Sequence, residues 1–157
     1  MAFDEGFVQP ENGIALEVSG LWKVFGHRPG QPLGAELKAG SKEEIREKTG
    51  KTIALRDVSF RVHKGEFFVV TGFSGCGKST LVRCILRLVE PASGAILVNG
   101  EDVCAYTPRQ VLDMRRYTIA AVFSHFGMFS HRSVLDNVAY GLKIRGMERH
   151  KRYERAR

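Results

Sequence analysis

The sequence of 157 residues contains no apolar run long enough to cross a membrane, since a spanning helix needs about 20 consecutive apolar residues. Its N-terminus has no basic stretch followed by an apolar one, so we expect no secretory signal. Cysteine is scarce: Cys76, Cys84 and Cys104 form neither an even set nor a C-x-x-C pair. This usage argues against a disulfide framework and predicts reduced thiols in a cytosolic protein.

What is present is an ordinary globular composition, with 43% hydrophobic and 26% charged residues in about the length of one domain. The formal net charge of +7 is concentrated in the last fifteen residues, which carry seven cations against two glutamates. Such a run is usually a solvated helix face, and it lacks the interleaved aromatics of single-strand binders. We therefore expect no nucleic-acid partner. A module that binds nucleic acid through this basic tail is the competing hypothesis.

Hydrophobic periodicity divides the chain into short strands and helices. Alternation predicts strands with one wet face at 14–18 and 55–63. A further strand is predicted at 95–98, which returns over 101–106 after a type I′ turn at Asn99-Gly100. Short continuous apolar runs predict strands that are covered on both faces, at 66–70 and 118–123. Helices are predicted at 42–48, after residue 79, at 108–116, from 134 and from about 147. The helix at 42–48 has a capping box but is too short to be stable alone, so it either docks on another part of the chain or is an inserted surface element.

One motif carries a strong chemical signal. The segment GFSGCGKS at residues 72–79 matches G-x-x-x-x-G-K-[ST] and lies between an apolar run and an amphipathic helix. Its glycines let backbone amides approach phosphate oxygens, Lys78 reaches the β- and γ-phosphates, and the Ser79 hydroxyl joins the coordination of Mg²⁺. The motif therefore predicts a nucleoside triphosphate and Mg²⁺ as ligands. The candidate binding residues here are Gly72, Ser74, Gly75, Cys76, Gly77, Lys78, Ser79 and Thr80.

The chain also resembles the ATP-binding subunits of ABC transporters, most closely those of glycine betaine/proline (osmoprotectant) importers. The stretches that carry the likeness are 21–26, 41–50, 72–80, 87–91 and 126–141. The resemblance implies an α/β P-loop NTPase fold of the ABC ATPase type, incomplete, with an N-terminal antiparallel β subdomain. It implies one partial nucleotide-binding domain, with a tail at 1–13, a subfamily insert at 27–51 and the start of a helical subdomain at 133–157.

The same resemblance implies roles for residues outside the phosphate loop. Phe25 is at the position of an aromatic that stacks on adenine, with Trp22 as the competing stacker. Ser124 stands where the family has a glutamine that touches Mg²⁺ and the transmembrane partner, and a serine reaches that metal only through a water. His125 lies one position along. Within the loop, Cys76 is either a reactive thiol beside Lys78 or a small filler.

No catalytic residue is predicted within the chain, because it has no LSGGQ-type signature and no Asp-Glu pair after an apolar strand. The resemblance puts these motifs and the switch histidine beyond residue 157, so we expect no hydrolysis by the chain alone. The family's partners are a transmembrane permease and a second ATPase subunit, with the assembly at the cytoplasmic face of the membrane. A small kinase or GTPase of another P-loop class, or an inactive truncated gene product, remains an alternative.

Overall fold

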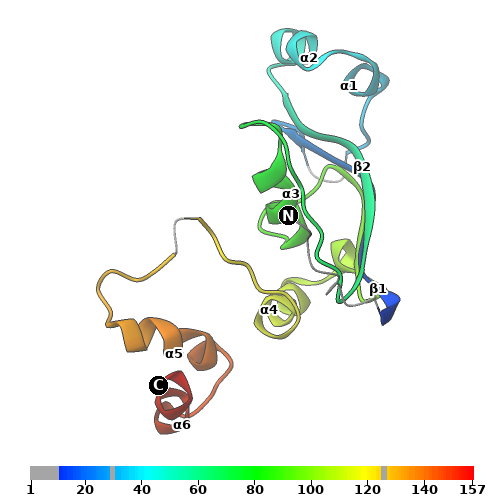
Figure 1. The fold of residues 1–157 in the computed structure, drawn as a ribbon. Coiled ribbons are helices and arrows are strands. Elements are labelled where there is room, and N and C mark those ends of the chain that lie inside the picture. Colours follow the sequence, from blue (N-terminus) through cyan, green and yellow to red (C-terminus); the bar gives the residue numbers. More distant parts are fainter. Residues whose placement is uncertain (1–10, 29–30, 125–126) are drawn as a thin grey trace, which may run out of the picture. The chain divides into compact units, whose positions relative to one another are not determined.

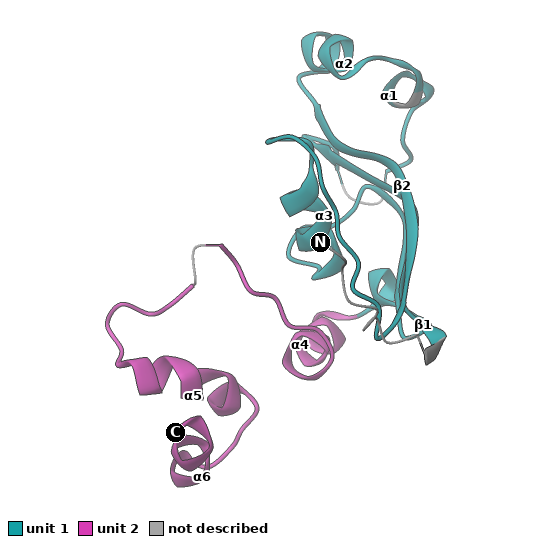
Figure 2. Cartoon of the chain, in the orientation of Figure 1, with its two compact units in different colours: residues 1–106 teal, residues 107–157 magenta. Residues whose placement is uncertain are grey.

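A computed structural model describes residues 11–28, 31–124 and 127–157. Its contacts divide the chain into two compact units, residues 1–106 and residues 107–157, which are shown in different colours in Figure 2. The first unit holds the β-sheet, the insert and the phosphate loop, and the second unit is helical.

The first unit is built on an antiparallel sheet of four strands in the order β2-β1-β3-β4. The strands are β1 (Glu11–Phe25), β2 (Thr52–Lys64), β3 (Ser93–Val98) and β4 (Glu101–Asp102). This sheet confirms the predicted N-terminal antiparallel β structure. The prediction that the first strand stops at residue 18 is wrong, because β1 continues to Phe25. The strand passes Gly20 through a register shift between Val18 and Leu21, where the Gly20 amide donates to Ser59 Oγ at 2.8 Å.

The turn between β3 and β4 has the predicted type I′ geometry, with φ of 50° at Asn99 and 85° at Gly100. The predicted return strand is too long. β4 ends at Asp102, and a 3-10 helix η1 (Val103–Ala105) follows, because the Asp102 side chain accepts a hydrogen bond from the Cys104 amide at 2.8 Å. A side chain that caps the next turn competes with continuation of the ladder.

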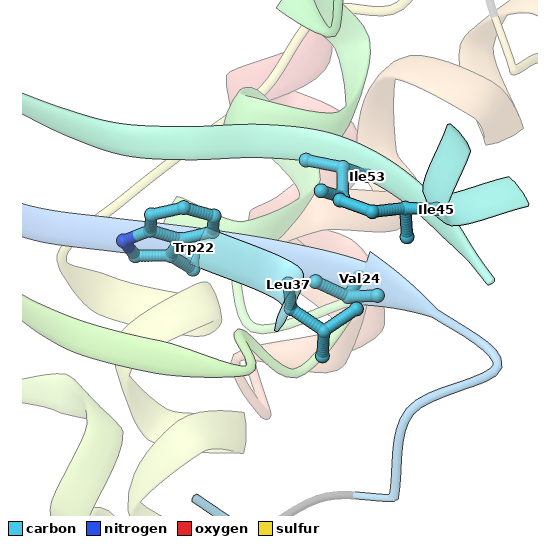
Figure 3. Packing of buried hydrophobic residues seen from close by; sticks show 5 residues of the cluster. All are labelled: Trp22, Val24, Leu37, Ile45 and Ile53. Carbon is cyan, nitrogen blue, oxygen red and sulfur yellow. The ribbon is translucent and has the colours of Figure 1, made fainter. Parts of the chain in front are cut away.

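The insert between β1 and β2 forms two short helices, α1 (Ala35–Ala39) and α2 (Lys42–Thr49), beyond one end of the sheet (Figure 1). The capping box of Ser41 and Glu44 is present, and α2 ends at Gly50 with a left-handed φ of 68°. The helices dock as expected, through one apolar cluster that is drawn in Figure 3. The cluster consists of Trp22, Val24, Leu37, Ile45 and Ile53.

The predicted buried strands at 66–70 and 118–123 are wrong. Neither segment forms a strand, and apart from Ile119 their large apolar side chains are exposed: Phe67 is 79% and Val122 is 96% accessible. A strand that is covered on both faces needs hydrogen-bonded neighbours and a layer on each side. The described sheet offers no strand beside 66–70, whose Phe68 instead stacks its ring on Phe60 of β2 at 5.0 Å.

Helix α3 (Lys78–Ile85) follows the phosphate loop, buries Leu81 and Cys84, and contacts β2. The second unit contains α4 (Pro108–Tyr117), α5 (Val134–Ile144) and α6 (Arg149–Ala156), and the last two pack together. The predicted caps are present: Thr107 and Gln110 form a capping box, and Ser133 Oγ accepts from the Asp136 amide at 3.1 Å. Across the described ranges, none of these helices has the length and apolarity that a membrane span requires.

Candidate functional site

The phosphate loop reaches its shape through glycines at two turns. Gly75 and Gly77 have φ of 79° and 107°, and Gly77 is the N-cap residue of α3. A Cβ at Gly77 would lie 2.5 Å from the carbonyl oxygen of Ala54, far inside van der Waals contact. The loop therefore lies directly against the backbone of β2, and only glycine fits at this contact.

Lys78 folds back across the loop. Its ammonium Nζ donates to the carbonyl oxygens of Gly72 at 2.6 Å and Phe73 at 2.8 Å, and lies 3.5 Å from Cys76 Sγ. These bonds hold a full positive charge over the concave side of the loop. An anionic phosphate oxygen is a stronger acceptor for this ammonium than a neutral carbonyl, because both partners are then charged.

The start of α3 adds further donors to the same place. The first bond of the helix runs from the Leu81 amide to the Gly77 carbonyl at 2.8 Å, so the amides of Lys78, Ser79 and Thr80 have no partner within the helix. These amides and the positive end of the helix dipole favour an anion at this terminus. The loop, the lysine and the helix end thus converge on one anion-binding corner.

A cleft of about 430 Å³ joins this corner to the adjacent ends of β1 and β2. Its lining residues are Phe25, Thr52, Ile53, Ala54, Ser74, Gly75, Gly77, Lys78, Ser79 and Thr80. None of them is acidic, so nothing in the lining opposes a polyphosphate. The structure therefore brings predicted site residues from two distant parts of the sequence to one cleft.

The two candidate stacking residues have different environments. The Phe25 ring lines the cleft and is 44% accessible, with Lys23 Nζ 5.0 Å from its centroid. Trp22 is 8% accessible, belongs to the apolar cluster under the insert, and has the Arg56 guanidinium 5.7 Å from its ring. Only the Phe25 ring is open to the cleft.

The remaining predicted residues lie in other surroundings. Cys76 is exposed within the loop, whereas burial raises the pKa of the Cys84 thiol to about 11. Ser124 is an exposed turn residue of the second unit, so its proposed contact with the metal stays a prediction. His125 lies outside the described residues.

Sequence reasoning missed the contribution of β2 to the cleft. Thr52, Ile53 and Ala54 all line it, and none of them belongs to the phosphate-loop motif. The signal available in the sequence was the position of residue 52, which directly follows the insert at 27–51, while Phe25 lies just before that insert. Two segments that flank an insert in adjacent antiparallel strands must lie side by side, whatever the insert contains.

Comparison with known proteins identifies the family of the chain. The family model described as ABC transporter matches residues 55–157. The chain belongs to the ABC transporter family. It is 41% identical over 143 residues to the glycine betaine/proline betaine transport system ATP-binding protein ProV of Salmonella typhimurium, covering 91% of this chain and 36% of that protein. It is 40% identical over 141 residues to the glycine betaine/carnitine transport ATP-binding protein GbuA of Listeria monocytogenes, covering 90% and 36%.

Solved structures support the same fold. The dimeric post-hydrolysis structure of the ATP-binding cassette MJ0796, bound to ADP and Pi, matches with a TM-score of 0.68 and 24% identity. That match covers 90% of this chain and 53% of the cassette. The predicted resemblance and the α/β cassette fold are therefore confirmed, and the chain spans about half of the solved cassette and about a third of the curated relatives.

Proposed function

We propose that this chain binds Mg-ATP as the nucleotide-binding part of an ABC importer for glycine betaine/proline-type osmoprotectants. The observation that carries the proposal is the single cleft that contains both the phosphate loop with Lys78 and the exposed ring of Phe25. A triphosphate and a base separated by a ribose need these two kinds of surface within one site. The named relatives, which are ATP-binding proteins of betaine transport systems, support the choice of nucleotide and of transported class.

In this proposal each part of the cleft has a separate role. Lys78 and the amides at the start of α3 hold the phosphates through charge-assisted hydrogen bonds. The Phe25 ring stacks on the base, which requires only a flat π face. Ser79 is the residue that would hold Mg²⁺; when bound, the ion neutralises part of the phosphate charge. Ser124 is at most a water-mediated second contact.

The proposed partners are a transmembrane permease subunit and a second ATPase subunit, with the assembly at the inner face of the cell membrane. The dimeric MJ0796 cassette, which has the same fold, supports pairing of two such subunits. No residue of this chain is assigned to catalysis of hydrolysis. Its proposed contribution is to bind and orient the nucleotide.

Calorimetric titration of the full chain with Mg-ATP tests the proposal. Lys78→Ala removes one charge-assisted contact, which is worth about 1.5–3 kcal/mol or roughly a ten- to hundredfold loss of affinity. Lys42→Ala is the matched control, since Lys42 is exposed at the start of α2 and does not line the cleft. Equal affinities of the wild type and Lys78→Ala, with unchanged circular dichroism, would refute the phosphate-binding role.

A further inference from the structure

Stacking on Phe25 leaves the choice of base undecided, because every base presents a π face. Selection needs a directional contact with the polar edge of the base. Among the residues that line the cleft, the polar side chains of the phosphate loop and of α3 are Ser74, Lys78, Ser79 and Thr80. Outside these, Thr52 has the only polar side chain in the lining, beside Phe25, Ile53 and Ala54.

Thr52 is also placed where the edge of a stacked base must lie. Phe25 and Thr52 are directly opposite each other in the antiparallel ladder of β1 and β2. Directly opposite residues have Cβ atoms about 4.5–5.5 Å apart and side chains on the same face of the sheet. A base that lies flat on the Phe25 ring therefore has the Thr52 hydroxyl beside it, and Thr52 is exposed.

The insert packs against the strand residues next to Phe25 and Thr52. Gly26 and the insert at 27–51 leave β1 after Phe25 and return at Thr52, so these two residues flank the connection that carries the insert. Leu37 and Ile45 of its helices pack with Ile53, the neighbour of Thr52, in the apolar cluster (Figure 3). Val24, the neighbour of Phe25, packs in the same cluster, so the ladder that sets the spacing between Phe25 and Thr52 is held by packed side chains on its other face.

We propose that Thr52 is the residue that contacts the edge of the base, and that the cleft takes purine nucleoside triphosphates with little choice between adenine and guanine. A threonine hydroxyl is both a donor and an acceptor and rotates to suit its partner. It accepts from the adenine amino group or donates to the guanine carbonyl with equal ease. This inference rests on the proposed nucleotide site and adds the class of nucleotide that the site admits.

Titration of the full chain with Mg-ATP, Mg-GTP and inorganic tripolyphosphate tests it. In the wild type the Kd values for ATP and GTP should agree within about threefold. Thr52→Val keeps the branched shape and removes the hydroxyl, so it should weaken both nucleotides by about two- to tenfold, the value of one hydrogen bond, and leave tripolyphosphate unchanged. Thr52→Ser should bind like the wild type. Thr118→Val, at an exposed threonine outside the cleft, is the matched control.

The outcomes separate this inference from the function on which it rests. Thr52→Val with wild-type Kd values for both nucleotides, or a wild type that prefers one purine by more than about tenfold, overturns it, since one hydrogen bond is worth no more than that. An equal loss of tripolyphosphate affinity in Thr52→Val also overturns it, because the residue would then act through the fold. In each of these cases the proposed phosphate site is still supported if tripolyphosphate binds to the wild type and binds more weakly to Lys78→Ala. If neither nucleotide nor tripolyphosphate binds, the proposed function fails as well.

Discussion

The contrast between the two aromatic residues of β1 makes a sharp prediction. Phe25 and Trp22 are three residues apart, yet one ring is open to the cleft and the other is packed under the insert. Replacing each by alanine removes a comparable aromatic surface from the chain. The structure predicts that Phe25→Ala changes nucleotide binding and that Trp22→Ala changes stability.

The expected magnitudes follow from the surroundings of each ring. Phe25→Ala removes one base–aromatic stack of about 1–3 kcal/mol, which is roughly five- to 150-fold in Kd for Mg-ATP. Its cost to the fold is small, because the ring is 44% accessible and its contact with Lys23 is an exposed one, worth about 0.5–1 kcal/mol. Tripolyphosphate, which has no base, should bind this variant like the wild type.

Trp22→Ala should act through the core. Trp22 is 8% accessible and belongs to the cluster that holds α1 and α2, so its truncation should cost about 3–5 kcal/mol of unfolding free energy. That is a large share of the total for a domain, which is about 5–15 kcal/mol. Any loss of nucleotide affinity should equal the loss of folded protein, and tripolyphosphate should lose affinity in the same proportion.

Urea titration followed by circular dichroism gives the folded fraction of each variant. Calorimetry then gives the Kd of the folded protein, with the protein concentration corrected for that fraction. Phe67→Ala is the matched control, because Phe67 is an exposed aromatic residue of the same unit and does not line the cleft. A lower ATP affinity in folded Trp22→Ala than in folded Phe25→Ala, with tripolyphosphate unaffected, would move the stacking role to Trp22 and show that the cleft is misassigned.

Three further predictions concern the thiols, the helical unit and turnover. Maleimide at neutral pH should label exposed Cys76 well before Cys84, whose pKa is raised by burial, and bound Mg-ATP should slow the labelling; labelling of Cys84 first would contradict the burial. Hydrogen bonds from Tyr153 and Ser133 lower the pKa of Asp136 below its usual 3.8, so this carboxylate contributes stability above about pH 4 that is lost as the pH falls. Thermal unfolding followed by circular dichroism should show a stability that falls between about pH 6 and pH 3 in the wild type and falls less in Asp136→Asn. Identical pH profiles of the two proteins would show that these hydrogen bonds do not stabilise the helices. A polypeptide of these 157 residues should release no phosphate from Mg-ATP above background, because it supplies no group to position or activate the attacking water; multiple turnover abolished by Lys78→Ala would show unrecognised catalytic groups.

Features determined by neighbouring residues were predictable from the sequence. The capping boxes at Ser41 and Thr107 and the turn at Asn99 depend on contacts within four residues, and all three are present. The phosphate loop is predictable for the same reason, since its shape follows from its own glycines and from the helix that it starts. Each of these features is set by residues that are close in the sequence, so a short motif is enough to predict it.

Features that depend on distant strands were not predictable in the same way. The runs at 66–70 and 118–123 have the composition of buried strands, but composition cannot supply the hydrogen-bonded neighbours that a buried strand requires. The contribution of Thr52 was missed because it arises from the register of β1 against β2, across an insert. The periodicity of one sequence indicates on which side of a strand a residue lies, but it does not identify the residue opposite it on the neighbouring strand.

The first residues of β2 connect both halves of the candidate site to the core. Thr52 lies beside Phe25 at the base end of the cleft, and the carbonyl of Ala54 lies against Gly77 at the phosphate end. Between them, Ile53 is buried in the cluster with Ile45 of α2. One short stretch of strand thus sets the distance between the stacking ring and the phosphate loop, while the exposed segment before the loop contributes no ladder to hold it. The insert, through its packing on Ile53, is therefore part of the support of the proposed nucleotide site, even though none of its helical residues lines the cleft.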